Sequence, residues 1–159
     1  MNNPTTYHLP DEPRASLLAA NVASPLWPFL AFMLVGAWFG LAWFLFNSLA
    51  LGSPTWRREI AIAALALVGS VILLLALEAA GRQGWLDERA LRYAALSVVC
   101  LRLGCAYALN ILQERVYELH QYFGGNSRNG ALVLVGAMFI ARPAVAPLLG
   151  NSLLAAVLQ

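Results

Sequence analysis

The sequence has little charge, and arginine is its only strongly basic residue. It contains no lysine, and only 11% of its 159 residues are charged. Soluble domains carry charge on roughly a quarter of their residues, so these side chains are too few to cover a water-facing surface. Disordered chains have still more charge and fewer aromatic residues. A net charge of +2 is also too small for a nucleic-acid interface, so we expect no nucleic-acid partner.

Residues that carry common cofactor and catalytic chemistry are also scarce. The sequence lacks a P-loop, an HExxH motif, a nucleophile elbow and a dinucleotide-binding fingerprint. Cys100 and Cys105 are five residues apart on one predicted helix, where their Cα atoms would lie about 8.6 Å apart, too far for a disulfide. His8 and His120 cannot supply paired haem ligands at mid-membrane depth. We therefore predict no metal and no cofactor.

Long apolar runs dominate what is present. Hydrophobic residues make up 60% of the chain, and no charged residue occurs between Ala15 and Trp56. About 20 apolar residues are enough for a helix to cross a bilayer. We predict an all-α, polytopic integral membrane protein: a polar N-terminal tail over residues 1–24 and one domain over 25–159, a bundle of four transmembrane helices at about 26–51, 60–80, 90–113 and 131–157. Arginine without lysine, in a chain rich in alanine and leucine, indicates a bacterial source and hence the inner membrane.

The spacing of small residues and the helix lengths refine this bundle. Ala63, Ala66 and Ser70 recur at helical spacing, which predicts close packing between the second and third spans in an antiparallel hairpin. The helical pattern of the third span continues as far as Phe123, so that a helix of about 50 Å would extend beyond the bilayer. The last stretch contains Pro143 and crosses once or forms a re-entrant hairpin; we expect a single crossing. Arginine counts on the two sides are equal, so orientation is left open.

Two arginines fall inside predicted spans and need partners there. Arg102 lies near the middle of the third span and Arg142 within the fourth. A central arginine costs about 2.5 to 3.5 kcal/mol on insertion scales and rarely faces lipid. We expect Arg142 to pair with Glu114, with Asn110 as a second acceptor. No carboxylate lies at the depth of Arg102, so it either pairs structurally or binds an anion, a lipid headgroup or a partner protein.

Other candidate contact residues lie on helical faces. Arg102, Gln113 and His120 align on one face of the third helix, which is either a pore lining or docking face, or a polar strip buried in the bundle. Gly36 and Gly40 form a GxxxG pair, typical of close helix crossings between membrane helices. We assign both glycines to contacts with ligands or other subunits. The polar residues assigned to such contacts are Arg102, Asn110, Glu114, His120 and Arg142.

The leading functional hypothesis is a small, non-catalytic subunit of a larger bacterial inner-membrane assembly. It would contact lipids and other subunits, or a second copy of itself, through intramembrane arginines and small-residue helix faces. One alternative is a transporter or channel component with an anion or lipid-headgroup site at Arg102 and Arg142. Another is a membrane-embedded lipid-modifying enzyme that uses Glu114, Glu118 and His120 for proton chemistry.

Overall fold

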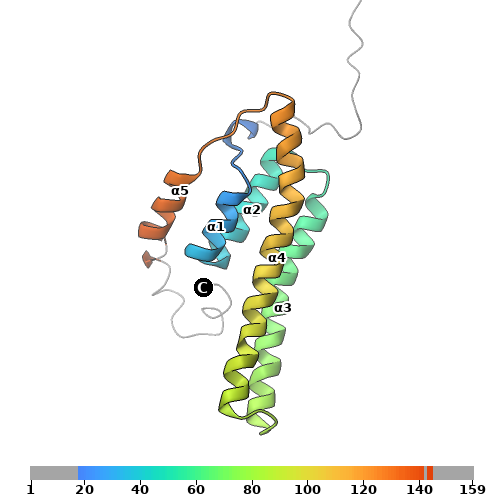
Figure 1. Ribbon diagram of the computed structural model, residues 1–159, viewed down its shortest axis with the longest axis vertical. Coiled ribbons are helices and arrows are strands. Elements are labelled where there is room, and N and C mark those ends of the chain that lie inside the picture. Colours follow the sequence, from blue (N-terminus) through green and yellow to red (C-terminus); the bar gives the residue numbers. More distant parts are fainter. Residues whose placement is uncertain (1–17, 142, 145–159) are drawn as a thin grey trace, which may run out of the picture.

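In a computed structural model, the protein is described over residues 18–141 and 143–144, and every regular element in that part of the chain is helical. The two long helices form the largest unit; the hairpin of two shorter helices packs beside it, and a further short helix lies on the far side of that hairpin (Figure 1). The elements in chain order are η1 (Ala19–Asn21), α1 (Leu26–Leu34), α2 (Ala37–Leu51), α3 (Trp56–Arg82), α4 (Glu88–Tyr122), α5 (Ala131–Gly136) and η2 (Ala137–Ala141).

The antiparallel hairpin of α3 and α4 confirms the prediction for the second and third hydrophobic stretches. Ala63, Ala66 and Ser70 are all buried, so the small residues do mark the packed side of α3. The Ser70 hydroxyl is satisfied within the helix, since it donates to the Ala66 carbonyl. Asp87 caps the start of α4 by accepting a hydrogen bond from the Ala90 amide at 2.8 Å. This bond satisfies one of the amides that the first turn of the helix leaves without a partner.

Both long helices have the length and composition of membrane-spanning helices. Helix α3 has 27 residues and α4 has 35, which correspond to about 40 and 52 Å at 1.5 Å per residue. Large apolar side chains on their outer faces are exposed, including Leu65, Ile72 and Leu96. Two helices of the described chain therefore meet the requirements for crossing a bilayer. Four such spans are not present within it.

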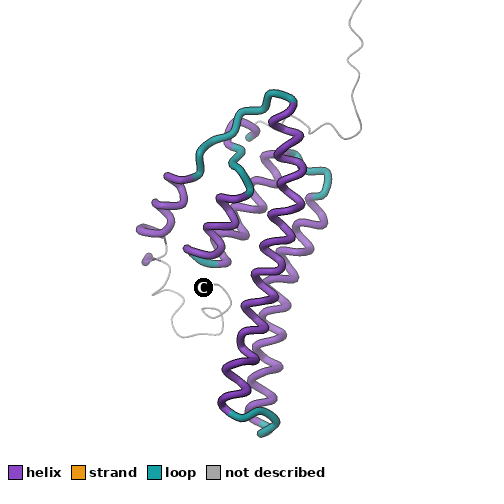
Figure 2. Tube along the Cα trace, in the orientation of Figure 1, coloured by secondary structure: helices purple, strands orange, loops and turns teal. Residues whose placement is uncertain are grey.

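The first hydrophobic stretch differs from the prediction, because residues 26–51 do not form one span. The chain turns back at Gly36, whose φ of 136° favours glycine, and α2 runs antiparallel to α1 (Figure 1). Gly40 then lies against α1 so closely that an added Cβ would be 2.4 Å from the Cα of Phe32. The turn between the two helices lies part-way along α4 (Figure 2). The segment is therefore a helical hairpin whose two ends lie at the same end of the bundle.

This hairpin also corrects the prediction that Gly36 and Gly40 contact another subunit. Both glycines are buried within the described chain. Gly36 makes the turn, and Gly40 lets α1 and α2 approach each other. The small-xxx-small spacing was recognised correctly as a close helix approach, but the two helices belong to the same hydrophobic run.

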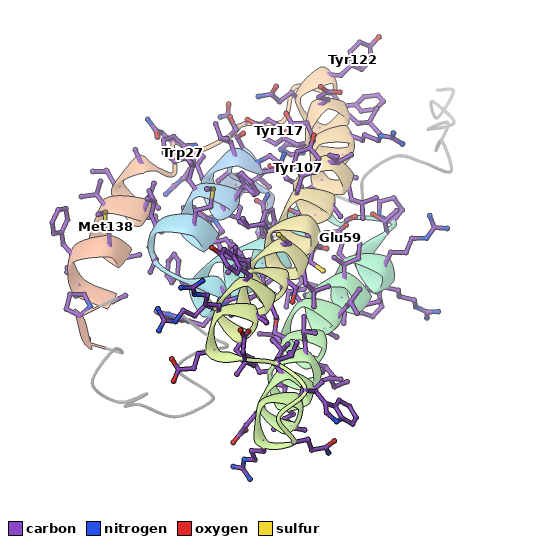
Figure 3. The ribbon with its side chains drawn as sticks, turned by 60° about the horizontal axis from the view of Figure 1, so that its bottom comes forward. Trp27, Glu59, Tyr107, Tyr117, Tyr122 and Met138 are labelled. Carbon is purple, nitrogen blue, oxygen red and sulfur yellow. The ribbon has the colours of Figure 1, made fainter. Side chains whose placement is uncertain are left out.

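The segment before the hairpin and helix α5 both pack against the hairpin. Val22 and Ala23 are buried, so the packed structure begins before the boundary predicted at residue 25. Trp27, at the start of α1, extends toward α5 (Figure 3) and packs against a cluster that includes Leu134 and Ala137. Of the predicted span at 131–157, the structure describes residues 131–141 and 143–144. Whether the stretch crosses the membrane once or twice therefore lies outside the described residues.

Candidate functional site

A chain of buried hydrogen bonds joins α2, α3 and α4 at the end of the bundle where α3 begins. Its acidic member is Glu59, in the first turn of α3, which is completely buried beside α4 (Figure 3). Its Oε1 accepts hydrogen bonds from the hydroxyls of Ser53 and Thr55, the latter at 2.9 Å. Its Oε2 accepts one from Gln113 Nε2 at 2.7 Å. These donors and the helix N-terminus stabilise a carboxylate that would otherwise be costly to bury.

Gln113 connects this carboxylate to the hairpin. Its Nε2 also donates to the Phe44 carbonyl of α2 at 2.7 Å, and its Oε1 accepts from Asn47 Nδ2 at 3.3 Å. Gln113 is completely buried. Tyr117, one turn further along α4, is also buried, and its hydroxyl accepts a hydrogen bond from Gln121 Nε2 at 2.8 Å. Gln113, one of the three residues expected on the polar face of this helix, is therefore buried against the bundle, and Tyr117 continues this buried strip.

Asn47 extends the network to the segment that precedes α1. Its Oδ1 accepts from the Ala23 amide at 3.1 Å, and its Nδ2 donates to the Ala23 carbonyl at 3.0 Å. The neighbouring Val22 carbonyl accepts from the amide of Arg128, in the α4–α5 connection, at 2.7 Å. The Asn47 side chain therefore holds the main chain at residues 22–23, to which the α4–α5 connection is hydrogen-bonded.

Arg102 has an aromatic neighbour that the sequence did not reveal. Its guanidinium carbon lies 5.9 Å from the centre of the Phe32 ring, a distance at which a cation and a ring attract each other. Phe32 is in the last turn of α1, close to the tip of the hairpin. It shares a buried cluster with Ala37 at the start of α2 and with Cys105 and Ala106 of α4. The hairpin tip thus lies next to the stretch of α4 that follows Arg102.

The predicted partnership of Arg142 falls outside the described residues. Glu114 is half-buried, and it has no ion pair or hydrogen bond within the described chain. The buried Oδ1 of Asn110, expected to be a second acceptor for Arg142, has no hydrogen-bond partner among the described residues. The pair therefore stays a prediction.

The residues proposed for proton chemistry are not joined in the structure. His120 Nε2 lies 3.4 Å from the Asn126 carbonyl, and the ring fills the space beside Gly125. Within the described chain no hydrogen bond connects His120 to Glu114 or Glu118. The imidazole therefore closes the turn after α4. Across the same residues, no group of three or more histidine, cysteine or acidic side chains is placed to hold a metal.

Sequence reasoning missed the two polar residues on which the network depends. Glu59 follows Arg57 and Arg58, and such a charged run is typical of an exposed junction between two spans. Asn47 is the only side-chain amide in the hydrophobic run at 26–51, and that isolation was the available signal. The hydrogen bonds of the network hold α2, α3 and α4 in fixed positions relative to one another. They also hold the segment before α1 and the α2–α3 connection.

Comparisons with known proteins give no family for this chain. No family model, no curated protein and no solved structure matches it. Function must therefore be argued from the geometry of its own residues.

Proposed function

We propose that the chain is a small, non-catalytic subunit of a larger assembly in a bacterial inner membrane, and that it binds a helix of another subunit through the outer face of α4. This face consists of Cys100, Gly104, Tyr107 and Ile111, spaced three and four residues apart on the side of α4 turned away from the bundle. All four are exposed. The buried residues of α4 lie on the opposite side.

One observation carries the proposal: a glycine and a tyrosine are exposed near the middle of α4. A Cβ added to Gly104 would meet nothing within 4 Å, so the helix has a notch at this point. Tyr107 beside it is 59% exposed. A phenol group at mid-span lacks the water that it finds at a membrane interface, and buried tyrosines usually have a hydrogen-bond partner. A neighbouring helix would fill the notch and could supply that partner.

The test uses Cys100, which lies on the outer face of α4, whereas the other described cysteine, Cys105, is buried. In membranes of the source cells, a membrane-permeant maleimide that carries a benzophenone should attach to Cys100 and, on illumination, insert into a C–H bond of a second protein; C100S should abolish the link. Gly104→Leu should fill the notch and dissociate the complex in mild detergent. Gly136→Leu is the matched control, because a Cβ at Gly136 also meets nothing within 4 Å. A monomer in mild detergent, or a complex unaffected by Gly104→Leu, would contradict the proposal.

A second candidate function, a transporter or channel component with an anion site at Arg102, is supported by the re-entrant hairpin. Discontinuous helices in transporters direct their positive N-termini at anionic substrates. Here the N-terminus of α2 begins at the hairpin tip, and Arg102 lies beside Phe32 of the same tip. Anion flux into proteoliposomes that falls on Arg102→Gln, with the fold preserved, would favour this function. Absence of flux from the wild-type chain would remove it.

A further inference from the structure

A pocket of about 550 Å³ opens between α2, α5, the segment that precedes α1 and the α4–α5 connection. Its volume lies in the range of roughly 300 to 1,000 Å³ that is usual for ligand sites. The polar network does not line it, apart from Ala23. It is also separate from the outer face of α4, since no residue of α4 contributes to it.

One part of the pocket wall is aromatic and apolar. Phe39 and Trp43 of α2 line it, together with Leu132 of α5. The two rings meet edge to face with their centres 5.8 Å apart. Both residues are only partly buried by the rest of the chain. Phe39 lies near the hairpin tip and Trp43 one turn closer to the end of α2, so this wall follows the axis of the helix.

The other part of the pocket is polar and cationic. Asn21, Arg128 and Asn129 line it, and they come from η1 and the α4–α5 connection. Arg128 is exposed and makes no ion pair with an acidic residue in the described chain. A guanidinium group offers paired N–H donors that match the oxygens of a phosphate.

The polar part is held rigidly, which favours binding. The Arg128 amide donates to the Val22 carbonyl at 2.7 Å. Next to it, both main-chain groups of Ala23 are bonded to Asn47, and Asn47 is bonded to Gln113. On the other flank, Gly130 lies against the Trp27 ring so closely that a Cβ would be 2.6 Å from its Cγ. The buried network therefore holds the main chain at Arg128.

We propose that this pocket binds one anionic phospholipid, with the phosphate at Arg128 and an acyl chain along Phe39 and Trp43. The order of the lining residues matches the order of groups in a lipid: a charged headgroup where the connections lie, and hydrocarbon along α2 toward the hairpin tip. A small soluble phosphate would use the polar part but leave the aromatic wall unoccupied. The inference rests on the chain being in a membrane, but not on its having a partner subunit.

The test is quenching of tryptophan fluorescence in nanodiscs of phosphatidylcholine. Phosphatidylglycerol with brominated acyl chains is titrated in, and brominated phosphatidylcholine serves as the neutral lipid. The anionic lipid should quench at a mole fraction several-fold lower than the neutral one. Trp43→Phe should remove this preferential component, because it removes the fluorophore in the pocket while keeping an aromatic wall.

The charge variants separate a site from general attraction to an anionic surface. Arg128→Gln should raise the mole fraction of phosphatidylglycerol for half-quenching about tenfold, and its circular dichroism should match the wild type because the side chain is exposed. Arg115→Gln is the matched control, since Arg115 is also exposed but lies outside the pocket. Equal quenching by the two lipids, or equal effects of the two substitutions, would overturn the proposal.

Two further measurements distinguish other outcomes. Glycerol phosphate at millimolar concentration should not displace the lipid; full displacement would indicate a site for a soluble phosphate and would contradict the role of the aromatic wall. The Gly104→Leu variant should bind phosphatidylglycerol as the wild type does. The lipid site and the subunit interface can therefore fail independently.

Discussion

Replacing Gln113 by leucine should destabilise the bundle by about 2 to 4 kcal/mol. Gln113 is completely buried; it donates one hydrogen bond each to Glu59 and the Phe44 carbonyl, and it accepts one from Asn47. Hydrogen bonds to charged groups contribute about 1.5 to 3 kcal/mol, and neutral bonds between membrane helices average about 0.6. Leucine is similar in size, so the loss comes from unpaired polar groups, above all the Glu59 carboxylate, rather than from a cavity.

The assay is reversible unfolding in mixed micelles by increasing mole fraction of dodecyl sulfate, followed by circular dichroism at 222 nm. A double-mutant cycle with Glu59→Leu identifies the cause. Once both groups are apolar, no buried charge is left without its donor, so the double variant should be less destabilised than the sum of the two single variants by about 1 to 3 kcal/mol. A loss below about 0.5 kcal/mol for Gln113→Leu, or strict additivity, would refute the reasoning.

Three further predictions concern packing and polar pairing. Gly40→Ala should cost about 2 to 3 kcal/mol in the same assay, because its Cβ would overlap the Phe32 backbone; a neutral result would mean that α1 and α2 are not in contact there. Asn47→Ala should cost about 2 to 4 kcal/mol, because both main-chain groups of Ala23 would lose their partner, and hydrogen exchange at the Ala23 amide should accelerate; unchanged exchange would argue against this pairing. Asn110→Leu should cost about 1 to 3 kcal/mol, because its buried Oδ1, which has no partner in the described chain, is predicted to accept a hydrogen bond from Arg142, and that donor would be left unpaired; a neutral or stabilising result would remove Asn110 from the predicted pairing.

The hairpin of α3 and α4 was predictable because its signals are local. Each helix is a long apolar run, and the short polar linker between the runs forces them to be antiparallel neighbours. Ala63, Ala66 and Ser70 share one helical face, so their spacing also identified the packed side of α3. The α1–α2 hairpin was not predictable in this way, because an apolar run has the same composition whether it is straight or folded in two. The left-handed backbone at Gly36 is a property of three-dimensional context.

The candidate site depended on pairings across long sequence separations. Gln113 was placed correctly on a polar face of α4, but its partners Glu59 and Phe44 are 54 and 69 residues away. The Asn47 side chain bonds mainly to main-chain atoms of Ala23, which no side-chain pattern can indicate. The sequence predicted that Arg102 needs a partner and that no carboxylate lies at its depth. It gave no sign of the Phe32 ring, which the structure places beside the guanidinium group.

The most direct test of this account asks on which side of the membrane the two ends of the α1–α2 hairpin lie. Single cysteines replace Ser24, Pro54 and Gln83, each in a chain with Cys100→Ser and Cys105→Ala, and sealed vesicles of known orientation are treated with a membrane-impermeant maleimide. A re-entrant hairpin followed by a spanning α3 predicts that positions 24 and 54 are labelled from the same side and position 83 from the other. Labelling of positions 24 and 54 from opposite sides would contradict the hairpin, and with it the placement of the buried network and of the lipid pocket.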